Sequence, residues 1–268
     1  MTRFVLHPRS IGAQPGAVDA VGGVVWHVGR EFISRSPDGV RYRRCVQLNT
    51  VRIGSGPPIV CLHGMGKTAH TWDAVASELA ERFTVVAVDL PGHGASPCPD
   101  DPTAFTRDAA LADIDEIIDT LDGPAVLVGH SLGGYLALAH AATRPGVARG
   151  IVVLNTGPGF RDPEKREGWN ERSRRNAHRF GVPERVAALN LQEDSVVMDH
   201  VAEMMTPTLV VAGGDDRPEY AGAGGYLEAK MPDARLVVLE GGGHSMHEDT
   251  HAGDVATLIS SFVDDLAE

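Results

Sequence analysis

Gly129-His130-Ser131-Leu132-Gly133 joins a short apolar run, Pro124 to Val128, to a helical segment of small residues, Leu132 to Ala142. The pattern Gly-x-Ser-x-Gly is weak evidence alone, because glycine and serine are common in ordinary strand–helix turns. Between a buried strand and a helix, it predicts a sharp turn that exposes the serine hydroxyl at the carboxyl edge of a sheet. We expect that a side chain at either flanking glycine would crowd the neighbouring strand and helix.

Short β-rich runs alternate with helical patterns from about residue 40 onward. The strands are predicted at Ile59–His63, Thr84–Asp89, Ala125–Gly129, Gly150–Asn155, Leu209–Gly213 and Leu236–Glu240. These runs are rich in Val, Ile and Leu and nearly unbroken, which is typical of a parallel sheet covered on both faces. The helices are predicted near His70–Glu81, Phe105–Leu121, Leu132–Thr143 and Gly253–Leu266. Before the parallel part, residues 40–53 predict an antiparallel pair or one long edge strand.

The alternation predicts an α/β fold with a doubly wound, mostly parallel sheet and ligands beyond the carboxyl ends of its strands. Two regions fall outside it. Residues 1–38 lack a clear period, and we expect an N-terminal extension that lies over the domain or is partly disordered. Residues 156–206 form a polar, mostly helical insertion, so the core comprises residues 39–155 and 207–268.

The composition is that of an ordinary soluble globular chain. Its 268 residues, 43% of them hydrophobic, suffice for one core without metal or disulfide support. A formal net charge of −12 argues against a nucleic-acid or anionic-membrane partner. No apolar run could span a membrane and the start has no signal-peptide pattern, which favours a cytoplasmic protein. Cys45, Cys61 and Cys98 lie far apart and predict neither a disulfide framework nor a zinc site.

A serine hydroxyl is a poor nucleophile at neutral pH, so Ser131 needs a base, and the base needs a third group to orient it. Two later loops at the same sheet edge supply both. The strand at 209–213 is followed by Gly214-Asp215-Asp216, and the strand at 236–240 by Gly241-Gly242-Gly243-His244. The order Ser, Asp, His, each directly after a strand, is more specific than any one motif.

With these motifs the chain resembles the serine-hydrolase branch of the α/β-hydrolase fold family over about residues 40–267. The resemblance rests on His63-Gly64-Met65-Gly66, Asp89-Leu90-Pro91-Gly92-His93-Gly94, Gly-His-Ser-Leu-Gly, Gly-Gly-Asp-Asp and Gly-Gly-His. It implies that Ser131 is the nucleophile, His244 the base and Asp216 the orienting acid. It also implies an oxyanion hole formed by the backbone N–H groups of Met65 and Leu132, and no cofactor. Serine at the elbow disfavours members with a nucleophilic aspartate, such as haloalkane dehalogenases and epoxide hydrolases.

The acid has two candidates. Asp215 competes with Asp216, which we prefer because the family usually places its acid fourth in a Gly-x-x-Asp turn. Asn155 ends the strand that carries the acid in some variants of the family, but an amide cannot ionise. The orienting acid is therefore expected at Asp216.

Three further histidines are interpreted as packing residues. His93 and His130 are expected to support loops, and His247 to be structural or to lie at the pocket edge. The order His244-x-x-His247-Glu248 matches neither arrangement of the zinc-peptidase motifs and lacks a third ligand, so no metal site is expected.

In this family the insertion usually forms a cap over the active site and sets specificity. Because it has only about fifty residues here, we expect a modest pocket, with Phe160, Trp169 and Phe180 as candidate lining residues or as anchors of the cap. The insertion also carries a basic cluster, Arg172, Arg174, Arg175 and Arg179. This cluster is either a solvated helix face, partly paired with acidic neighbours, or an anionic handle in which Arg174 and Arg175 bind a carboxylate or a phosphopantetheine carrier.

The sequence thus predicts a serine hydrolase that acts on a small carboxylic ester or thioester through an acyl-enzyme on Ser131. The chain lacks the Gly-Pro-Gly run of many C–C bond hydrolases and the Gly-Gly-x-Trp pattern of proline iminopeptidases. Two alternatives stay open: a C–C bond hydrolase or cofactor-free perhydrolase with the same triad, and a ligand-sensing protein of slow turnover. The expected partner is a small acyl substrate, and the oligomeric state cannot be read from the sequence.

Overall fold

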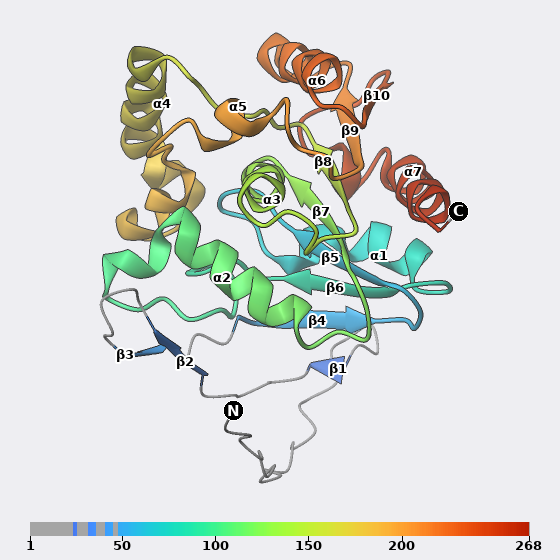
Figure 1. Cartoon of the computed structure of the whole chain (residues 1–268), viewed down its shortest axis with the longest axis horizontal. Coiled ribbons are helices and arrows are strands. Elements are labelled where there is room, and N and C mark those ends of the chain that lie inside the picture. The colour runs from blue at the N-terminus through green and yellow to red at the C-terminus, as the bar shows by residue number, and fades with distance from the viewer. Residues whose placement is uncertain (1–23, 26–31, 36–40, 45–47, 268) are drawn as a thin grey trace, which may run out of the picture.

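A twisted sheet runs through the centre of the computed structural model, with helices on both faces (Figure 1). The structure describes residues 24–25, 32–35, 41–44 and 48–267. Within these ranges eight strands form one sheet in the order β1-β4-β6-β5-β7-β8-β9-β10. Their bounds are Val24–Val25 (β1), Thr50–Ile53 (β4), Pro58–Leu62 (β5), Thr84–Val88 (β6), Val126–His130 (β7), Gly150–Leu154 (β8), Thr208–Gly213 (β9) and Ala234–Leu239 (β10).

Six neighbouring strands are mutually parallel, in the sheet order β6, β5, β7, β8, β9, β10. At one edge β4 runs antiparallel to β6, and β1 runs antiparallel to β4. All six predicted parallel strands are present with small shifts of their ends. Alternate residues of β5 enter different cores, because successive side chains of a strand point to opposite faces. Val60 and Leu62 belong to one hydrophobic cluster, and Ile59 and Cys61 to the other. The mostly parallel α/β sheet predicted from the sequence is confirmed.

Two helix layers complete these cores. Helices α1 (Asp73–Leu79) and α7 (Ala252–Asp265) cover one face, and α2 (Arg107–Ile118), α3 (Leu132–Thr143) and α6 (Pro218–Lys230) cover the other. The predicted helices are confirmed at four places, although the first one splits into a 3₁₀ turn, η1 (Ala69–Trp72), followed by α1. A second 3₁₀ turn, η2 (Pro102–Phe105), precedes α2.

Helix α6 was not predicted, because three of its residues are glycines, which lower intrinsic helix propensity. Gly222 and Gly225 face open space, but Gly224 packs on the sheet. A Cβ at Gly224 would lie 3.1 Å from the Leu236 side chain and 3.5 Å from that of Val210. The glycine therefore lets α6 lie close over β9 and β10, and tertiary packing outweighs the weak local preference.

The prediction for residues 40–53 is wrong. Two short strands form there, but they neither pair with each other nor merge. β3 (Arg41–Arg44) pairs with β2 (Phe32–Arg35) in a separate two-stranded sheet, whereas β4 joins the edge of the main sheet beside β6. β6 offers β4 a free edge of the main sheet, and all four residues of β4 pair with it. Apart from β1 and β2, the predicted extension at 1–38 lies outside the described residues.

The insertion between β8 and β9 is helical. It contains α4 (Pro163–Asn176), the 3₁₀ segments η3 (Ala177–Phe180) and η4 (Glu184–Asn190), and α5 (Val196–His200); a further 3₁₀ turn, η5 (Met246–Glu248), precedes α7. Asp162 caps α4, because its carboxylate accepts the N–H of Glu164 at 2.9 Å. We call residues 156–206 the cap. None of the helices in the described ranges is long and apolar enough to cross a membrane.

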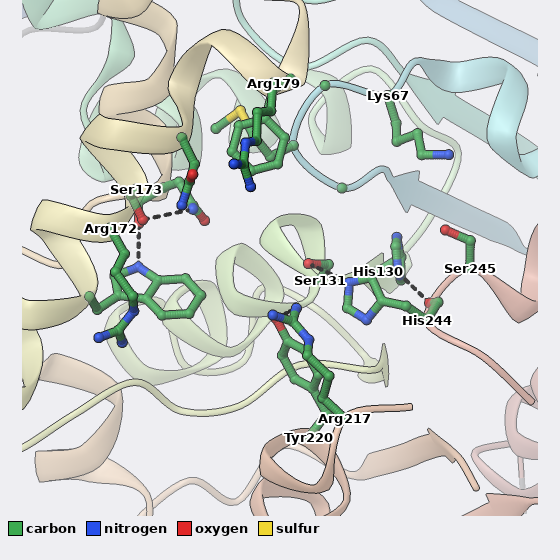
Figure 2. Close-up of a pocket in the computed structure, with 17 residues that line it drawn as sticks. Lys67, His130, Ser131, Arg172, Ser173, Arg179, Arg217, Tyr220, His244 and Ser245 are labelled. Atoms are coloured by element: carbon green, nitrogen blue, oxygen red, sulfur yellow. Dashed lines mark hydrogen bonds between the residues drawn. The ribbon is translucent and has the colours of Figure 1, made fainter. Parts of the chain in front are cut away.

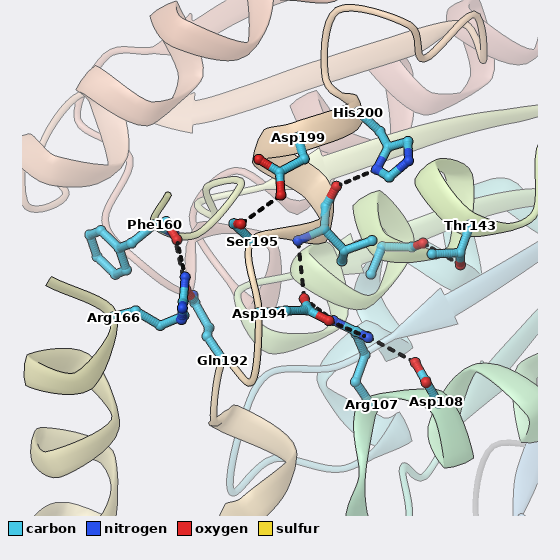
Figure 3. Close-up of polar contacts among 12 residues, drawn as sticks. Arg107, Asp108, Thr143, Phe160, Arg166, Gln192, Asp194, Ser195, Asp199 and His200 are labelled. Carbon is cyan, nitrogen blue, oxygen red and sulfur yellow. Dashed lines mark hydrogen bonds and ion pairs between the residues drawn. The ribbon is translucent and has the colours of Figure 1, made fainter. Parts of the chain in front are cut away.

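An ion pair ties the cap to the core (Figure 3). Arg107 of α2 donates to both carboxylate oxygens of Asp194, at 2.6 and 3.1 Å, and also to Asp108 at 3.0 Å. Burial disfavours the charged guanidinium, but the hydrogen bonds to Asp194 and Asp108 outweigh it and raise the pKa of Arg107. The same bond lowers the pKa of Asp194, which also accepts the N–H of Val196 at the start of α5.

Candidate active site

Ser131 occupies the turn between β7 and α3 in a strained conformation, with φ 51° and ψ −110°. A Cβ added at Gly129 would lie 2.2 Å from the carbonyl oxygen of Gly133, and one at Gly133 would lie 2.2 Å from that of Leu62. The expected crowding at both glycines is therefore confirmed. The Ser131 N–H donates to the Leu154 carbonyl oxygen at 2.9 Å, which fixes the turn against β8.

Ser131, His244 and Asp216 form a hydrogen-bonded line. His244 Nδ1 lies 2.7 Å from Asp216 Oδ2, and His244 Nε2 lies 3.3 Å from Ser131 Oγ. The Asp216 side chain is only 3% exposed, and its other oxygen accepts the N–H of Arg217 at 2.7 Å. Asp215 points to solvent. Of the two candidate acids, Asp216 is thus the one that can hold the His244 ring with Nε2 free to accept a proton.

Asn155 connects the loops that carry the acid and the base. Its Nδ2 donates to the carbonyl oxygens of Gly243 (3.0 Å) and His244 (2.8 Å), and its Oδ1 accepts the N–H of Gly213 (2.8 Å). Its backbone is left-handed, with φ 48°, a conformation that asparagine tolerates better than most residues. The Asn155 side chain therefore holds the backbone that carries His244 and does not orient the His244 ring.

The two proposed oxyanion donors come from different segments, the start of α3 and the loop after β5. Leu132 is the first residue of α3, so its N–H has no acceptor within the helix. Met65 follows β5 in a loop that lines the same cavity as Ser131. His93 holds this loop, since its Nε2 accepts the N–H of Gly66 at 3.1 Å. Burial lowers the pKa of His93 and keeps the ring neutral for that bond, so its interpretation as a loop-packing residue is confirmed.

His130 and His247 lie behind the candidate base. His130 Nε2 donates to the carbonyl oxygen of His244 at 2.8 Å, and its ring packs against His247 with centroids 4.4 Å apart. His247 also packs on Trp72, again at 4.4 Å. Burial lowers the pKa of His130 well below its ordinary value and that of His247 to about 4. Both rings are neutral packing elements, as expected.

A cavity of about 430 Å³ opens beside Ser131 (Figure 2). From the cap, α4 contributes Trp169, Arg172, Ser173 and Asn176, whose spacing of three, four and seven residues defines one helix face. Trp169 is thus a lining residue, as expected, and its indole N–H donates to the carbonyl oxygen of Asn190 at 2.8 Å.

For three cap residues the structure supports the alternative interpretation, an anchor of the cap for Phe160 and a solvated helix face for Arg174 and Arg175. Phe160 does not line the cavity; it packs against Trp169 at a centroid distance of 6.1 Å. Arg174 and Arg175 lie on a different face of α4 from the residues that line the cavity, and Arg174 pairs with Glu167 at 2.7 Å. The basic residues that do line the cavity are Lys67, Arg172, Arg179 and Arg217.

Arg217 and Tyr220 were missed by the sequence reading. Arg217 Nη2 donates to the Tyr220 hydroxyl at 3.0 Å and its guanidinium lies over the ring at 4.8 Å. The Tyr220 hydroxyl lies next to Ser131, and its ring packs against that of His244. Burial and, to a lesser degree, Asp216 raise the pKa of Tyr220. The available signal was that Arg217 directly follows the proposed acid; Tyr220 belongs to α6, which was not predicted.

The fold and this arrangement define an α/β protein with a serine elbow at the carboxyl edge of its sheet. The family model described as "Alpha/beta hydrolase family" matches residues 59–258, and the chain belongs to this family. An uncharacterised protein of Mycobacterium tuberculosis is 40% identical over 118 residues, which are 43% of this chain and 33% of that protein. The match thus spans about a third of that relative.

Longer matches exist at lower identity. A pimeloyl-[acyl-carrier protein] methyl ester esterase of Nitrosomonas europaea is 26% identical over 237 residues, which cover 72% of this chain and 90% of the relative. The structure of a thermophilic esterase from Thermogutta terrifontis, with malate bound, superposes with a TM-score of 0.72 at 22% identity and covers 89% of this chain and 99% of that one. The structural likeness shows the shared fold.

Proposed function

We propose that this chain is a hydrolase that cleaves a small carboxylic ester or thioester through an acyl-enzyme on Ser131. The observation that carries the proposal is the line of hydrogen bonds from Asp216 through His244 to Ser131 at the edge of a cavity. The esterase named among its relatives supports the same reaction class.

In the first half of the reaction, Ser131 Oγ attacks the carbonyl carbon while its proton passes to His244 Nε2. The 3.3 Å distance between these atoms is long, as is common in enzymes without substrate, and would shorten as the substrate binds. Asp216 stabilises the resulting imidazolium. The N–H groups of Met65 and Leu132 stabilise the oxyanion, and each such donor contributes about 3–4 kcal/mol in well-studied enzymes.

The tetrahedral intermediate then collapses. The bond between the carbonyl carbon and the leaving oxygen or sulfur breaks, and His244 gives its proton to the departing alcohol or thiol. Water attacks the acyl-enzyme by the same route: its proton goes to His244, the carboxylic acid is released, and the proton returns to Ser131 Oγ. The buried, neutral His130 supports this cycle by bonding the backbone of His244 without competing for the proton.

Ser131→Ala provides the test. Wild type and variant would be treated with a fluorophosphonate probe and assayed with p-nitrophenyl esters of increasing acyl length. We expect the probe to label only the wild type, the wild type to hydrolyse the short esters, and the variant to lose at least a thousandfold in kcat/KM while it stays folded. Equal turnover by Ser131→Ala would refute the assignment, and product analysis would separate ester from C–C bond cleavage.

A further inference from the structure

The cavity beside Ser131 is electrically unlike the rest of the molecule. The chain carries a formal net charge of −12, but four of the residues that line this cavity are Lys or Arg. Within the described ranges, no Asp or Glu lines it. The charge at the site is therefore opposite in sign to that of the whole chain, which a solvated helix face does not require.

Three of the four cations have no carboxylate partner in the described part of the chain. Lys67 is neutralised by Glu248 at 2.9 Å. Arg172, Arg179 and Arg217 form no ion pair there, although Arg174, Arg161, Arg107 and other arginines do. Some arginines away from the cavity, such as Arg149 and Arg175, also lack an ion pair in the described ranges. The three that line the cavity differ from these in their position, which leaves their charge for a ligand there.

These arginines come from three segments that enclose the cavity from different sides. Arg172 of α4 and Arg179 of η3 belong to the cap, whereas Arg217 follows Asp216 (Figure 2). A single hydroxyl, that of Tyr220, lies between the Arg217 guanidinium and Ser131. One end of the basic lining is therefore next to the reacting atom, and the other lies across the cavity from it.

We infer that the substrate is a compact ester or thioester with an anionic group, a carboxylate or a phosphate, that the arginines at 172, 179 and 217 bind. Guanidinium groups suit both anions, because their N–H groups can donate two parallel hydrogen bonds to a carboxylate or a phosphate. This inference rests on the proposed function and narrows its substrate class. The modest cavity volume of about 430 Å³ favours a small acyl group near the charge.

Two matched substrate pairs test the two sources of the anion. Monomethyl glutarate and methyl pentanoate differ in a carboxylate on the acyl part, and S-acetyl phosphopantetheine and S-acetyl pantetheine differ in a phosphate on the leaving group. We expect wild type to prefer the anionic member of at least one pair by tenfold or more in kcat/KM. The pair that shows the preference identifies the source of the charge.

The double variant Arg172→Gln/Arg179→Gln should lose most of that preference. The ratio of kcat/KM values within a pair is the readout, because it cancels any general loss of folded or active enzyme. Arg174→Gln is the matched control, since this arginine lies on the same helix but pairs with Glu167 outside the cavity; its ratio should equal that of wild type. Arg179→Lys, which keeps the charge, should retain part of the preference.

A ratio near one for both pairs in wild type would overturn the inference, as would a ratio that the double variant leaves unchanged. If no ester is cleaved and Ser131 is not labelled, the proposed function fails by itself. Calorimetric titration of glutarate and of phosphopantetheine into Ser131→Ala, with and without the two cap substitutions, then decides the anion site. Weaker binding by at least tenfold in the substituted protein supports it, and equal or absent binding rejects it.

Discussion

Ser131 and Asn155 are the non-glycine residues with positive φ in the described ranges, at 51° and 48°. Ser131 directly follows β7 and Asn155 directly follows β8, which are neighbouring strands. Left-handed backbone costs free energy for residues with a Cβ and persists where the surroundings impose it. One strained residue presents the candidate nucleophile, and the other holds the loop of the candidate base.

Asn155→Ala should lower kcat by about ten- to a hundredfold with little change in KM. The substitution removes both bonds to the Gly243 and His244 carbonyl groups. The backbone of His244 therefore loses its support, whereas the residues that line the cavity are unchanged. Second-layer partners of a catalytic group typically matter to this extent. Steady-state kinetics with a p-nitrophenyl ester measures the split between kcat and KM.

Asn49→Ala is the control, because it removes a comparable amide bond, to Asp89, beside β4 and β6 instead of beside the loop of His244. Asn155→Asp should be at least as harmful as Asn155→Ala, since it places a carboxylate oxygen against two carbonyl groups. If Asn155→Ala raised KM and left kcat intact, Asn155 would act on the substrate side and the positioning role would be wrong.

At this scale the sequence predicted the hydrogen-bonded line but not its surroundings. Ser131, Asp216 and His244 each follow a predicted strand, and the parallel sheet brings such positions to one edge. No local pattern indicates that Tyr220 reaches Ser131, because that contact depends on how α6 lies over the sheet. The rotation of α4 about its own axis likewise decides that Arg172, and not Arg174, faces the cavity. The sequence does not fix this rotation, because α4 is polar and has few apolar residues to mark a buried face.

At the scale of elements, a half-buried ion pair between Arg107 and Asp194 clamps the cap to the core. Arg107 is only 8% exposed and its partner Asp194 is 49% exposed. The cap has a second arginine–aspartate pair, Arg161 with Asp199, at 3.1 Å, in which both side chains are at least half exposed. The two pairs share the same chemistry and differ in burial, which makes them a matched comparison.

Asp194→Ala should lower the free energy of unfolding by roughly 1–3 kcal/mol, because it leaves a buried guanidinium with one carboxylate neighbour instead of two. Asp199→Ala should change it by less than about 1 kcal/mol, as is typical of exposed pairs. Urea denaturation gives both values. Hydrogen exchange should show faster opening of α5 in the first variant only, and equal effects of the two substitutions would contradict the clamp.

Elements with a strong periodicity of apolar residues were predictable. Elements that depend on packing against segments far away in the sequence were not. Helix α7 places Val255, Ile259 and Phe262 on one face, which marks it from the sequence alone. The sequence predicted β4 as part of a local antiparallel pair or of one long edge strand, because its actual partner, β6, is more than thirty residues later. No local feature of the sequence indicates that β4 pairs with β6.

On the scale of the whole molecule, buried neutral histidines make stability sensitive to acid. Burial lowers the pKa of His63 and His247 from 6.5 to about 4, and it lowers those of His93, His130 and His140 as well. The unfolded chain therefore binds more protons than the folded chain between pH 6.5 and about 4. Stability rises with pH through this window and falls on acidification.

The free energy of unfolding should thus drop between pH 6.5 and pH 4, by up to roughly 3 kcal/mol for each histidine with a shift of this size. His247→Phe should flatten the dependence, since the His247 ring packs between Trp72 and His130 and its nitrogens have no partner in the described ranges. Urea titrations at several pH values measure the slope. His70→Gln, at an exposed site, is the control, and a wild-type slope unchanged by His247→Phe would reject the assignment.

The elbow has a further consequence for how the protein matures. Its hydrogen bonds are made with segments far along the chain: Ser131 N–H with Leu154, and Gly133 N–H with the carbonyl oxygen of His63. The hydrogen-bonded partners of the serine, Asp216 and His244, are synthesised after it. Under the proposed function, Ser131 is an ordinary serine in a nascent or partly unfolded chain, and it becomes reactive only when the loops that follow β9 and β10 have docked. Covalent labelling at Ser131 would then count completely folded molecules in a mixed population, as an active-site titration of folding yield.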